Sequence, residues 1–138
     1  MRTTDKNLVA EAVAQYAQAV ENFDPGSWLM LEDNVALTND NKDIALFERN
    51  ETSAKAVYGH YFFWSRGKQA VKAAKEFLKE IFTTKHYGVE VIVGLTPADH
   101  KAALWVNKQL GFKEVDTLRG PEGTVKMVVL TKQDWENK

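Results

Sequence analysis

The stretch WSRGKQAVKAAKEFL, which begins at Trp64, combines the side chains and the backbone that could bind a phosphate. Apolar residues at helical spacing follow it and predict a helix from about Gly67 to Phe82. The first four backbone N–H groups of a helix lack intrahelical partners, and the helix dipole adds about half a positive charge there. Arg66 and Lys68 add full charges beside this point, and Gly67 permits close backbone approach. The junction therefore predicts an anion site, suited above all to a pyrophosphate.

Two well-known phosphate loops are absent from the sequence. It contains neither G-x-x-x-x-G-K-[ST] nor G-x-G-x-x-G. A plainer interpretation of the same segment is a helix with a basic first turn, whose lysines are solvated or paired with Glu76 and Glu80. Both interpretations stay open at this level.

The first half of the chain predicts a helix followed by three strands. Apolar spacing predicts a helix over residues 5–22, ended by Asp24-Pro25-Gly26. Strands are expected over 35–38 and 44–49, joined by the turn residues 39–42, and over the aromatic-rich segment 56–64.

The second half predicts a strand, a helix and a hairpin. The apolar run 89–95 is typical of a central strand buried on both faces. Thr96 as N-cap, Pro97 at the first helical position and Asp99 at the third predict a helix to about Leu110, closed by Gly111. Segments 112–118 and 125–131 are expected to form a closing hairpin. We expect one domain over residues 1–138, of mixed α/β (α+β) class and built on a single sheet.

Two segments together resemble the GNAT superfamily of acyl-CoA-dependent N-acetyltransferases, including small members encoded by bacteriophages. They are YFFWSRGKQAVKAAKEFL and VEVIVGLTPADHKAALWVNKQLGF, and the resemblance covers about residues 35–131. Members of that family carry a Q/R-x-x-G-x-G/A loop at a helix start, followed by a strand and a helix that commonly ends in Leu-Gly-Phe. The resemblance implies a mixed, mostly antiparallel sheet with flanking helices, in which two central parallel strands splay apart.

The resemblance implies acetyl-CoA as co-substrate and assigns residues to it. Arg66 takes the first motif position, but Gln69 stands where glycine is usual and Val71 where glycine or alanine is usual. Pantetheine would lie between strands 56–64 and 89–95, against the backbone near Gly59 and Tyr61. The full cofactor-binding set implied is Gly59, Tyr61, Arg66, Gly67, Lys68, Gln69, Ala70, Val71 and Asn107.

Two residues are candidates for catalysis. His60 could act as general base towards the acceptor amine, although a strand histidine facing solvent is the plainer interpretation. Glu48 or Glu51 could act in its place through a water molecule. Asn107 replaces the tyrosine that in many family members protonates the leaving thiolate, and His100 replaces the usual asparagine. Asn107 can donate or accept a hydrogen bond, but a polar residue on an exposed helix face is the alternative.

The sequence thus predicts an acetyl-CoA-dependent N-acetyltransferase that acts by direct attack of an amine within a ternary complex. The alternative is a catalytically degenerate GNAT-fold module that binds a partner protein, or an acyl-CoA sensor. The acceptor, a small molecule or a protein, is not identified, and a homodimer stays open.

Composition argues against several other classes of function. The net charge of −1 argues against nucleic acid as a partner, and the three histidines have no metal-ligand spacing. The absence of cysteine excludes a thiol nucleophile and fits a cytoplasmic location, and no segment predicts a signal peptide or a membrane span.

Overall fold

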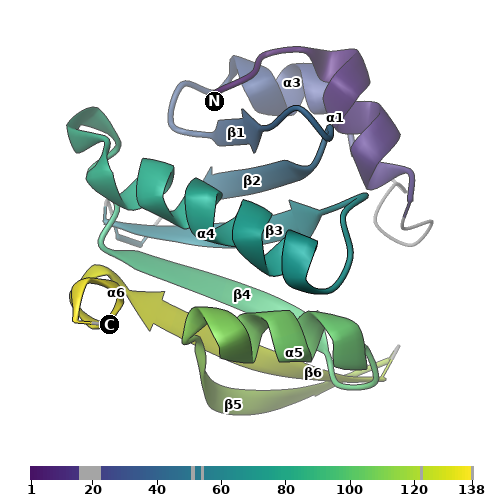
Figure 1. Ribbon diagram of the computed structural model, residues 1–138, viewed down its shortest axis with the longest axis vertical. Helices are drawn as coiled ribbons and strands as arrows, with labels where there is room; N and C mark the ends of the chain where they lie inside the picture. Colours follow the sequence, from purple (N-terminus) through teal and green to yellow (C-terminus); the bar gives the residue numbers. More distant parts are fainter. Residues whose placement is uncertain (16–22, 51, 54, 122, 138) are drawn as a thin grey trace.

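The computed structural model describes residues 1–15, 23–50, 52–53, 55–121 and 123–137, and its centre is a six-stranded sheet. The strands lie in the order β1-β2-β3-β4-β6-β5 (Figure 1). β3 and β4 are parallel, and every other neighbouring pair is antiparallel. The mixed, mostly antiparallel sheet predicted from the sequence is therefore confirmed. The strand bounds are β1 Val35–Thr38, β2 Ile44–Arg49, β3 Ala56–Phe62, β4 Val91–Pro97, β5 Lys113–Gly120 and β6 Gly123–Thr131.

Helices lie on both sides of this sheet. The long helices α4 (Lys68–Thr83) and α5 (Lys101–Leu110) lie on one face (Figure 1). The short helices α1 (Lys6–Val13) and α3 (Pro25–Met30) pack through a second apolar cluster against the other face, at the β1–β2 end. A short 3-10 helix, Lys85–Tyr87, precedes β4, and α6 (Lys132–Glu136) follows β6; neither was predicted from the sequence.

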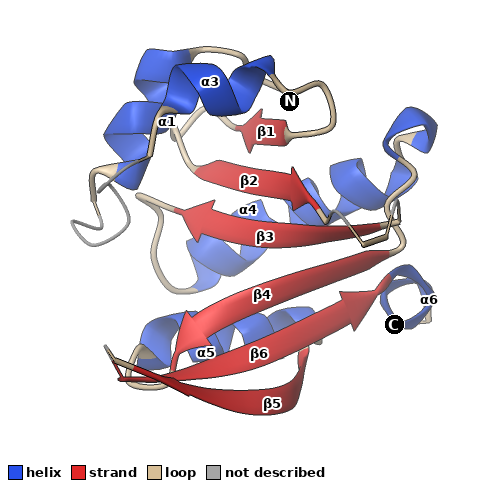
Figure 2. Cartoon of the chain, turned by 180° about the vertical axis from the view of Figure 1, so that it is seen from behind, coloured by secondary structure: helices blue, strands red, loops and turns tan. Residues whose placement is uncertain are grey.

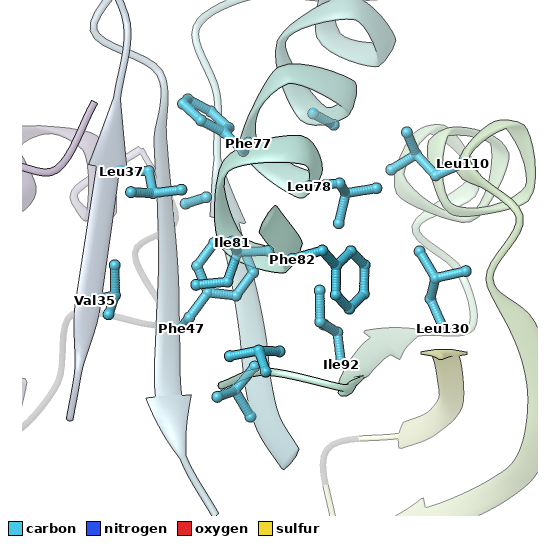
Figure 3. Close-up of a cluster of buried hydrophobic side chains, with 14 of the residues drawn as sticks. Val35, Leu37, Phe47, Phe77, Leu78, Ile81, Phe82, Ile92, Leu110 and Leu130 are labelled. Atoms are coloured by element: carbon cyan, nitrogen blue, oxygen red, sulfur yellow. The ribbon is translucent and has the colours of Figure 1, made fainter. Parts of the chain in front are cut away.

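The main core fixes the position of α4 on the sheet. Figure 3 shows Phe77, Leu78, Ile81 and Phe82 of α4 gathered with Phe47 of β2 and Ile92 of β4, and all of these side chains are buried. Full burial of one such side chain contributes about 1.5–3 kcal/mol. The amphipathic stripe that predicted this helix therefore anchors it across β2, β3 and β4, and sets where its amino-terminal end must lie.

The first predicted helix is only partly correct. It begins as expected, because Asp5 caps it by accepting the N–H groups of Asn7 and Leu8, but α1 ends at Val13. Tyr16, Ala19 and Val20, which supported the longer helix, lie outside the described residues. Asp24-Pro25-Gly26, predicted to end a helix, begins α3, and residues 16–22 before it lie outside the described residues. The carboxylate of Asp24 accepts the N–H groups of Gly26 and Ser27, and Pro25 occupies the first turn, where its missing N–H costs nothing.

The predicted helix start at Thr96-Pro97 is wrong. Both residues belong to β4, which stays paired with β6 as far as Pro97↔Val125, and Ala98 still donates its N–H to the carbonyl of Thr124. Helix α5 begins at Lys101, with His100 in the cap position. The pairing of β4 with β6 therefore outweighs the preference of Thr96 and Pro97 for a helix start. The end of the helix is confirmed, because Gly111 adopts a left-handed conformation with φ of 92°.

The prediction that this central strand is buried on both faces is also wrong. Ile92 and Thr96 are buried beneath the helices, but Val91 and Val93 are half-buried and Leu95 is 48% exposed. These exposed residues lie on the face opposite α4 and α5. The apolar run therefore marks a strand with one open face.

Candidate functional site

The parallel strands β3 and β4 separate halfway along their length. They pair only at Ala56↔Val91, Val57↔Ile92 and Tyr58↔Val93. Beyond this point β3 stays paired with β2 as far as Phe62, and β4 stays paired with β6 as far as Pro97. Each strand therefore follows its outer neighbour, and the two diverge into a V (Figure 2). The predicted splay of two central parallel strands is confirmed.

The backbone of Gly59 and Tyr61 faces this V. Asn50 donates its N–H to the carbonyl of Ala56, and the alternation of an antiparallel ladder then turns the backbone groups of the even-numbered β3 residues towards β2. The odd-numbered residues face β4, as Lys55 does by accepting the N–H of Glu90 at 2.8 Å. Because pairing with β4 stops at Tyr58, peptide groups of Gly59 and Tyr61 point into the V. These are the two positions where the sequence resemblance placed pantetheine.

The amino-terminal end of α4 carries backbone donors that the helix itself does not use. Val71 makes the first helical bond, to the carbonyl of Gly67, so the N–H groups of Lys68, Gln69 and Ala70 have no helical acceptor. Among the described residues no side chain caps this end. Gly67 has φ of 58° and ψ of −131°, a conformation that is nearly exclusive to glycine. The loop from β3 brings these donors to the open end of the V (Figure 2).

Arg66 bends back onto the loop that precedes α4. Its guanidinium donates to the carbonyl oxygens of Phe63 and Ser65, and lies 3.5 Å from Oε1 of Gln15. In this arrangement Arg66 stabilises the loop through these hydrogen bonds, and its charge lies beside the amino-terminal end of α4. Lys68 and Gln69 are exposed there, whereas Ala70 is buried and Val71 packs half-buried against the main core.

The side chain of Asp43 binds the same loop through hydrogen bonds, and this residue was not identified from the sequence. Its carboxylate is fully buried and accepts the N–H of Trp64 at 2.7 Å, the N–H of Ser65 at 2.9 Å and the hydroxyl of Ser65 at 2.6 Å. The side-chain amide of Asn39 also donates to it, at 3.1 Å. Burial alone would raise the pKa of Asp43, but the hydrogen bonds from Ser65, Asn39 and Trp64 outweigh it and lower the pKa. The sequence signals only a turn at this point.

His60 and Glu48 lie on the face of the sheet opposite α4. Glu48 is half-buried and accepts the indole N–H of Trp28 at 2.9 Å. His60 is exposed, yet desolvation by neighbouring protein atoms lowers its pKa, and the charge of Glu48 opposes that shift. A lowered pKa leaves the imidazole neutral at neutral pH, which is the form a general base needs. Glu51, the other carboxylate considered, lies outside the described residues.

Asn107 is buried, so the alternative of a polar residue on an exposed helix face is wrong. Its side-chain N–H donates to the hydroxyl of Thr96 at 3.0 Å, and both side chains are 8% exposed. Thr96 belongs to the part of β4 that has left β3. The pair therefore ties α5 to the separated half of β4, on the same side of the sheet as α4.

Tyr61 was assigned from the sequence for its backbone alone, but its side chain is also unusual. The ring packs against Phe47 and Phe63, and the buried hydroxyl has no hydrogen-bond partner among the described residues. Burial raises the pKa of the phenol, which therefore stays protonated at neutral pH.

A groove of about 540 Å³ lies between α4 and α5, and reaches Lys68 at the amino-terminal end of α4. It is lined by Lys68, Val71, Lys72, Lys75, Glu76, Lys79, Trp105 and Gln109. Trp64 and Trp105 are 50% and 43% exposed, and Trp105 forms part of this groove.

The described residues contain no group of three or more metal-ligating side chains. Within the same part of the chain, no helix has both the length and the apolar character needed to cross a bilayer.

Comparison with known proteins gives a match in structure and none in sequence. No family model and no curated protein sequence matches the chain. A chimera of spermidine N-acetyltransferase SpeG from Vibrio cholerae with hSSAT aligns at a TM-score of 0.72 and 13% identity, over 99% of this chain and 97% of that one.

Two aminoglycoside acetyltransferases also align with the chain. The type Ii aminoglycoside 6'-acetyltransferase aligns at 0.71 and 13% identity, over 92% of this chain and 89% of that one. AAC(6')-Ib in complex with coenzyme A aligns at 0.69 and 17% identity, over 100% of this chain and 95% of that one. The chain therefore has the fold of the GNAT N-acetyltransferases, as the resemblance in its sequence predicted.

Proposed function

We propose that this protein is a GNAT N-acetyltransferase that binds acetyl-CoA and transfers the acetyl group to an amine. The observation that carries the proposal is the V between β3 and β4, with the uncapped amino-terminal end of α4 at its open end. A ligand with a long, thin arm attached to a diphosphate fits both parts. Among the structural neighbours, AAC(6')-Ib is in complex with coenzyme A, and SpeG is a spermidine N-acetyltransferase.

The backbone supplies the binding groups in this proposal. The N–H groups of Lys68, Gln69 and Ala70 would hold the diphosphate, assisted by the helix dipole and by the charges of Arg66 and Lys68. The peptide groups of Gly59 and Tyr61 would hold the pantetheine arm in the V, as a further strand would be held. When bound, acetyl-CoA supplies an activated acyl group as a thioester.

The side chains on the opposite face would handle the proton of the acceptor. An alkyl amine is mostly protonated at neutral pH and must lose a proton before its nitrogen can attack. We assign this role to His60, because the desolvation that lowers its pKa keeps it neutral, and because it lies between Gly59 and Tyr61 in sequence. Most of the rate enhancement would come from holding amine and acyl group together, together with hydrogen bonds to the developing oxyanion.

The role of Asn107 in this proposal is positioning. Its side-chain N–H is committed to Thr96, and an amide does not donate a proton to a thiolate at neutral pH. The hydroxyl of Tyr61 is buried and its pKa is raised, which makes it a weak proton donor. The leaving thiolate therefore takes its proton from water.

A binding module without catalysis is the rival, favoured by Gln69, Val71, His100 and Asn107, which depart from the family motif. Thermal unfolding with and without acetyl-CoA separates the two. Ligand at about 100 times its dissociation constant adds roughly 2.7 kcal/mol to stability, which gives a clear rise in midpoint. Release of the CoA thiol in the presence of mixed amines then reports transfer.

Lys68→Glu should weaken acetyl-CoA binding at least tenfold, because it places a negative charge at the proposed diphosphate site. Lys85→Glu is the matched control, since it makes the same charge change on an exposed residue beyond the far end of α4. A chain that shows no midpoint rise at millimolar acetyl-CoA would instead be the binding module.

A further inference from the structure

The strand registers order the side chains on the face of the sheet that carries His60. Glu48 lies opposite Tyr58, which lies opposite Val93, which lies opposite Val129, so these four side chains form one row across β2, β3, β4 and β6. Neighbouring strands are about 4.8 Å apart, so the row runs from a carboxylate to an apolar surface within roughly 15 Å.

The next row along the strands is interrupted by the V. Leu46 and His60 lie on one side of it, and Leu95 and Met127 lie on the other. Because pairing of β3 with β4 ends at Tyr58, the space between His60 and Leu95 is the mouth of the V on this face.

This part of the sheet face is open and apolar. Helices α1 and α3 cover β1 and β2 through Val9, Ala12 and Trp28, but no helix of the described chain covers β4 and β6 on this side (Figure 2). Leu95 is 48% exposed, and Val93, Met127 and Val129 are half-buried. A contiguous apolar surface of this kind commonly marks a binding site. We call these four residues the apolar strip.

Beside the apolar strip, Glu48 provides a negative charge. One of its carboxylate oxygens accepts the indole N–H of Trp28, which fixes the side chain, and no cation pairs with it among the described residues. Cationic groups are therefore attracted to the His60 side of the V, and apolar groups to the Leu95 side.

From this arrangement we propose that the acceptor of the acetyl group is a primary amine on an apolar body, alkyl or aromatic. The amine would lie between Glu48 and His60, and the body would lie on the apolar strip. This inference rests on the proposed acetyltransferase function and names its acceptor class. The amine binds as an ammonium, attracted by Glu48, and its proton passes to His60. The nitrogen lone pair then forms the bond to the acyl carbon, and the carbon–sulfur bond breaks to release the thiolate. The nitrogen gives up its second proton, which passes through water to the thiolate.

The competing acceptor classes need different surroundings. A polyhydroxylated amine such as an aminoglycoside needs many hydrogen-bond partners, and the apolar strip has none in its side chains. A polyamine needs several carboxylates spaced along its length. The described carboxylates of the two rows that border the V are Glu48 on β2 and Asp116, which lies opposite Met127 on the edge strand β5. Four strand spacings of about 4.8 Å separate them, which is too far for one short polyamine.

The test compares acceptors that share one amine and differ in their body. Propylamine, pentylamine and heptylamine form a series in which kcat/KM should rise by up to about fourfold per methylene, the ratio that corresponds to burial of that group. Spermidine and kanamycin should be poorer acceptors than heptylamine. Equilibrium binding of the same amines in the presence of CoA is measured as well, so that a failure of catalysis does not hide the acceptor preference.

Two variants locate the site. Leu95→Ser should flatten the dependence on chain length and leave acetyl-CoA binding unchanged. Leu118→Ser is its control, because Leu118 is 40% exposed on the edge strand β5, away from the V. Glu48→Gln should raise KM for every cationic amine and leave the chain-length dependence intact.

Three results would overturn the inference. One is a preference for spermidine or kanamycin over heptylamine, and another is a chain-length dependence that survives Leu95→Ser. The third is a dimer, detected by light scattering, that Leu95→Asp converts to a monomer, because a second copy of the chain would then cover the strip. Failure of the proposed function looks different, since the protein would then bind no acetyl-CoA and acetylate none of the amines.

Discussion

Replacement of Asp43 by asparagine is expected to destabilise the fold and to weaken cofactor binding together. The new side chain would have nearly the same shape but no charge, so the change tests the hydrogen bonds that hold the loop before α4. In the structure one carboxylate oxygen accepts the N–H groups of Trp64 and Ser65, and the other accepts the hydroxyl of Ser65 and the amide of Asn39.

The size of the effect follows from those four contacts. If the oxygen of the introduced amide accepts the two backbone N–H groups, its NH₂ group faces Ser65 and Asn39. The hydroxyl of Ser65 can rotate to accept a hydrogen bond from this NH₂ group. Asn39 cannot accept one, because its own NH₂ group points to the same place. At least one hydrogen bond is lost, and the three that remain become neutral. Hydrogen bonds to charged groups contribute about 1.5–3 kcal/mol and neutral ones about 0.5–1.5, so Asp43→Asn should cost about 2–4 kcal/mol. The fold should survive this loss, since domains of this size are stable by about 5–15 kcal/mol.

Urea unfolding measures the stability, and the acetyl-CoA midpoint shift measures the cofactor site. The exposed neighbour Asp40 provides the control, because Asp40→Asn makes the same charge change and should stay within about 0.5 kcal/mol of the original protein. Loss of stability below about 1 kcal/mol would refute the hydrogen-bond argument, because even the neutral bonds at stake contribute about that much. A loss of about 2–4 kcal/mol with unchanged acetyl-CoA affinity would show that this loop does not position the α4 amides.

The pH dependence gives a second check on Asp43. Its pKa in the folded protein is lowered, so the carboxylate contributes stability above the pKa of about 3.9 that it has when unfolded. That contribution is lost as the pH falls through the folded pKa. The stability difference between the original protein and Asp43→Asn should therefore be constant near neutrality and shrink below about pH 4.

Three further substitutions test the remaining roles. His60→Gln should lower kcat/KM by about a hundredfold or more. In the original protein kcat/KM should rise with pH with a midpoint below 6.5, because desolvation lowers the pKa of His60, and the substitution should abolish this rise. A midpoint above 6.5 would contradict the assignment. Tyr61→Phe should leave stability unchanged or raised, since the hydroxyl has no partner among the described residues, and should change kcat, measured as thiol release, by less than threefold; a larger loss of kcat would make Tyr61 a proton donor. Asn107→Ala should cost about 1–3 kcal/mol through the unpaired Thr96 and change kcat by less than threefold, and a larger loss of kcat at unchanged acetyl-CoA affinity would give Asn107 a part in the chemistry.

Local patterns were enough to predict several parts of this fold. The stripe on α4 repeats at helical spacing over four turns, and the structure places it from Lys68 to Thr83, within one residue of the prediction at each end. The turn residues 39–42 set the first hairpin, whose strands β1 and β2 have the predicted bounds. In each case the signal comes from residues close in sequence, and no distant contact opposes it.

Distant contacts account for what could not be predicted. Thr96 and Pro97 have the types of a helix start, but pairing with Lys126 and Val125 of β6 keeps them in the strand. Asp43 has the type of a turn residue, and its partners Trp64 and Ser65 lie more than twenty positions further along the chain. An apolar run also does not tell whether both of its faces are covered, and Leu95 is exposed because no described helix lies over it.

The departures of Gln69 and Val71 from the family motif are less severe in the structure than in the sequence. Both residues lie inside α4, in ordinary helical backbone, so neither position needs glycine for its conformation. Gln69 directs an exposed side chain to solvent, and Val71 packs half-buried against the core, while the N–H of Gln69 stays among the donors at the helix end. The position that does need glycine is Gly67, whose φ is positive, and there the chain has kept it. A diphosphate site made of backbone amides depends on the path of the chain more than on side-chain identity. The sharper test of the proposed enzyme is therefore whether the loop held by Asp43 keeps that path when the cofactor binds.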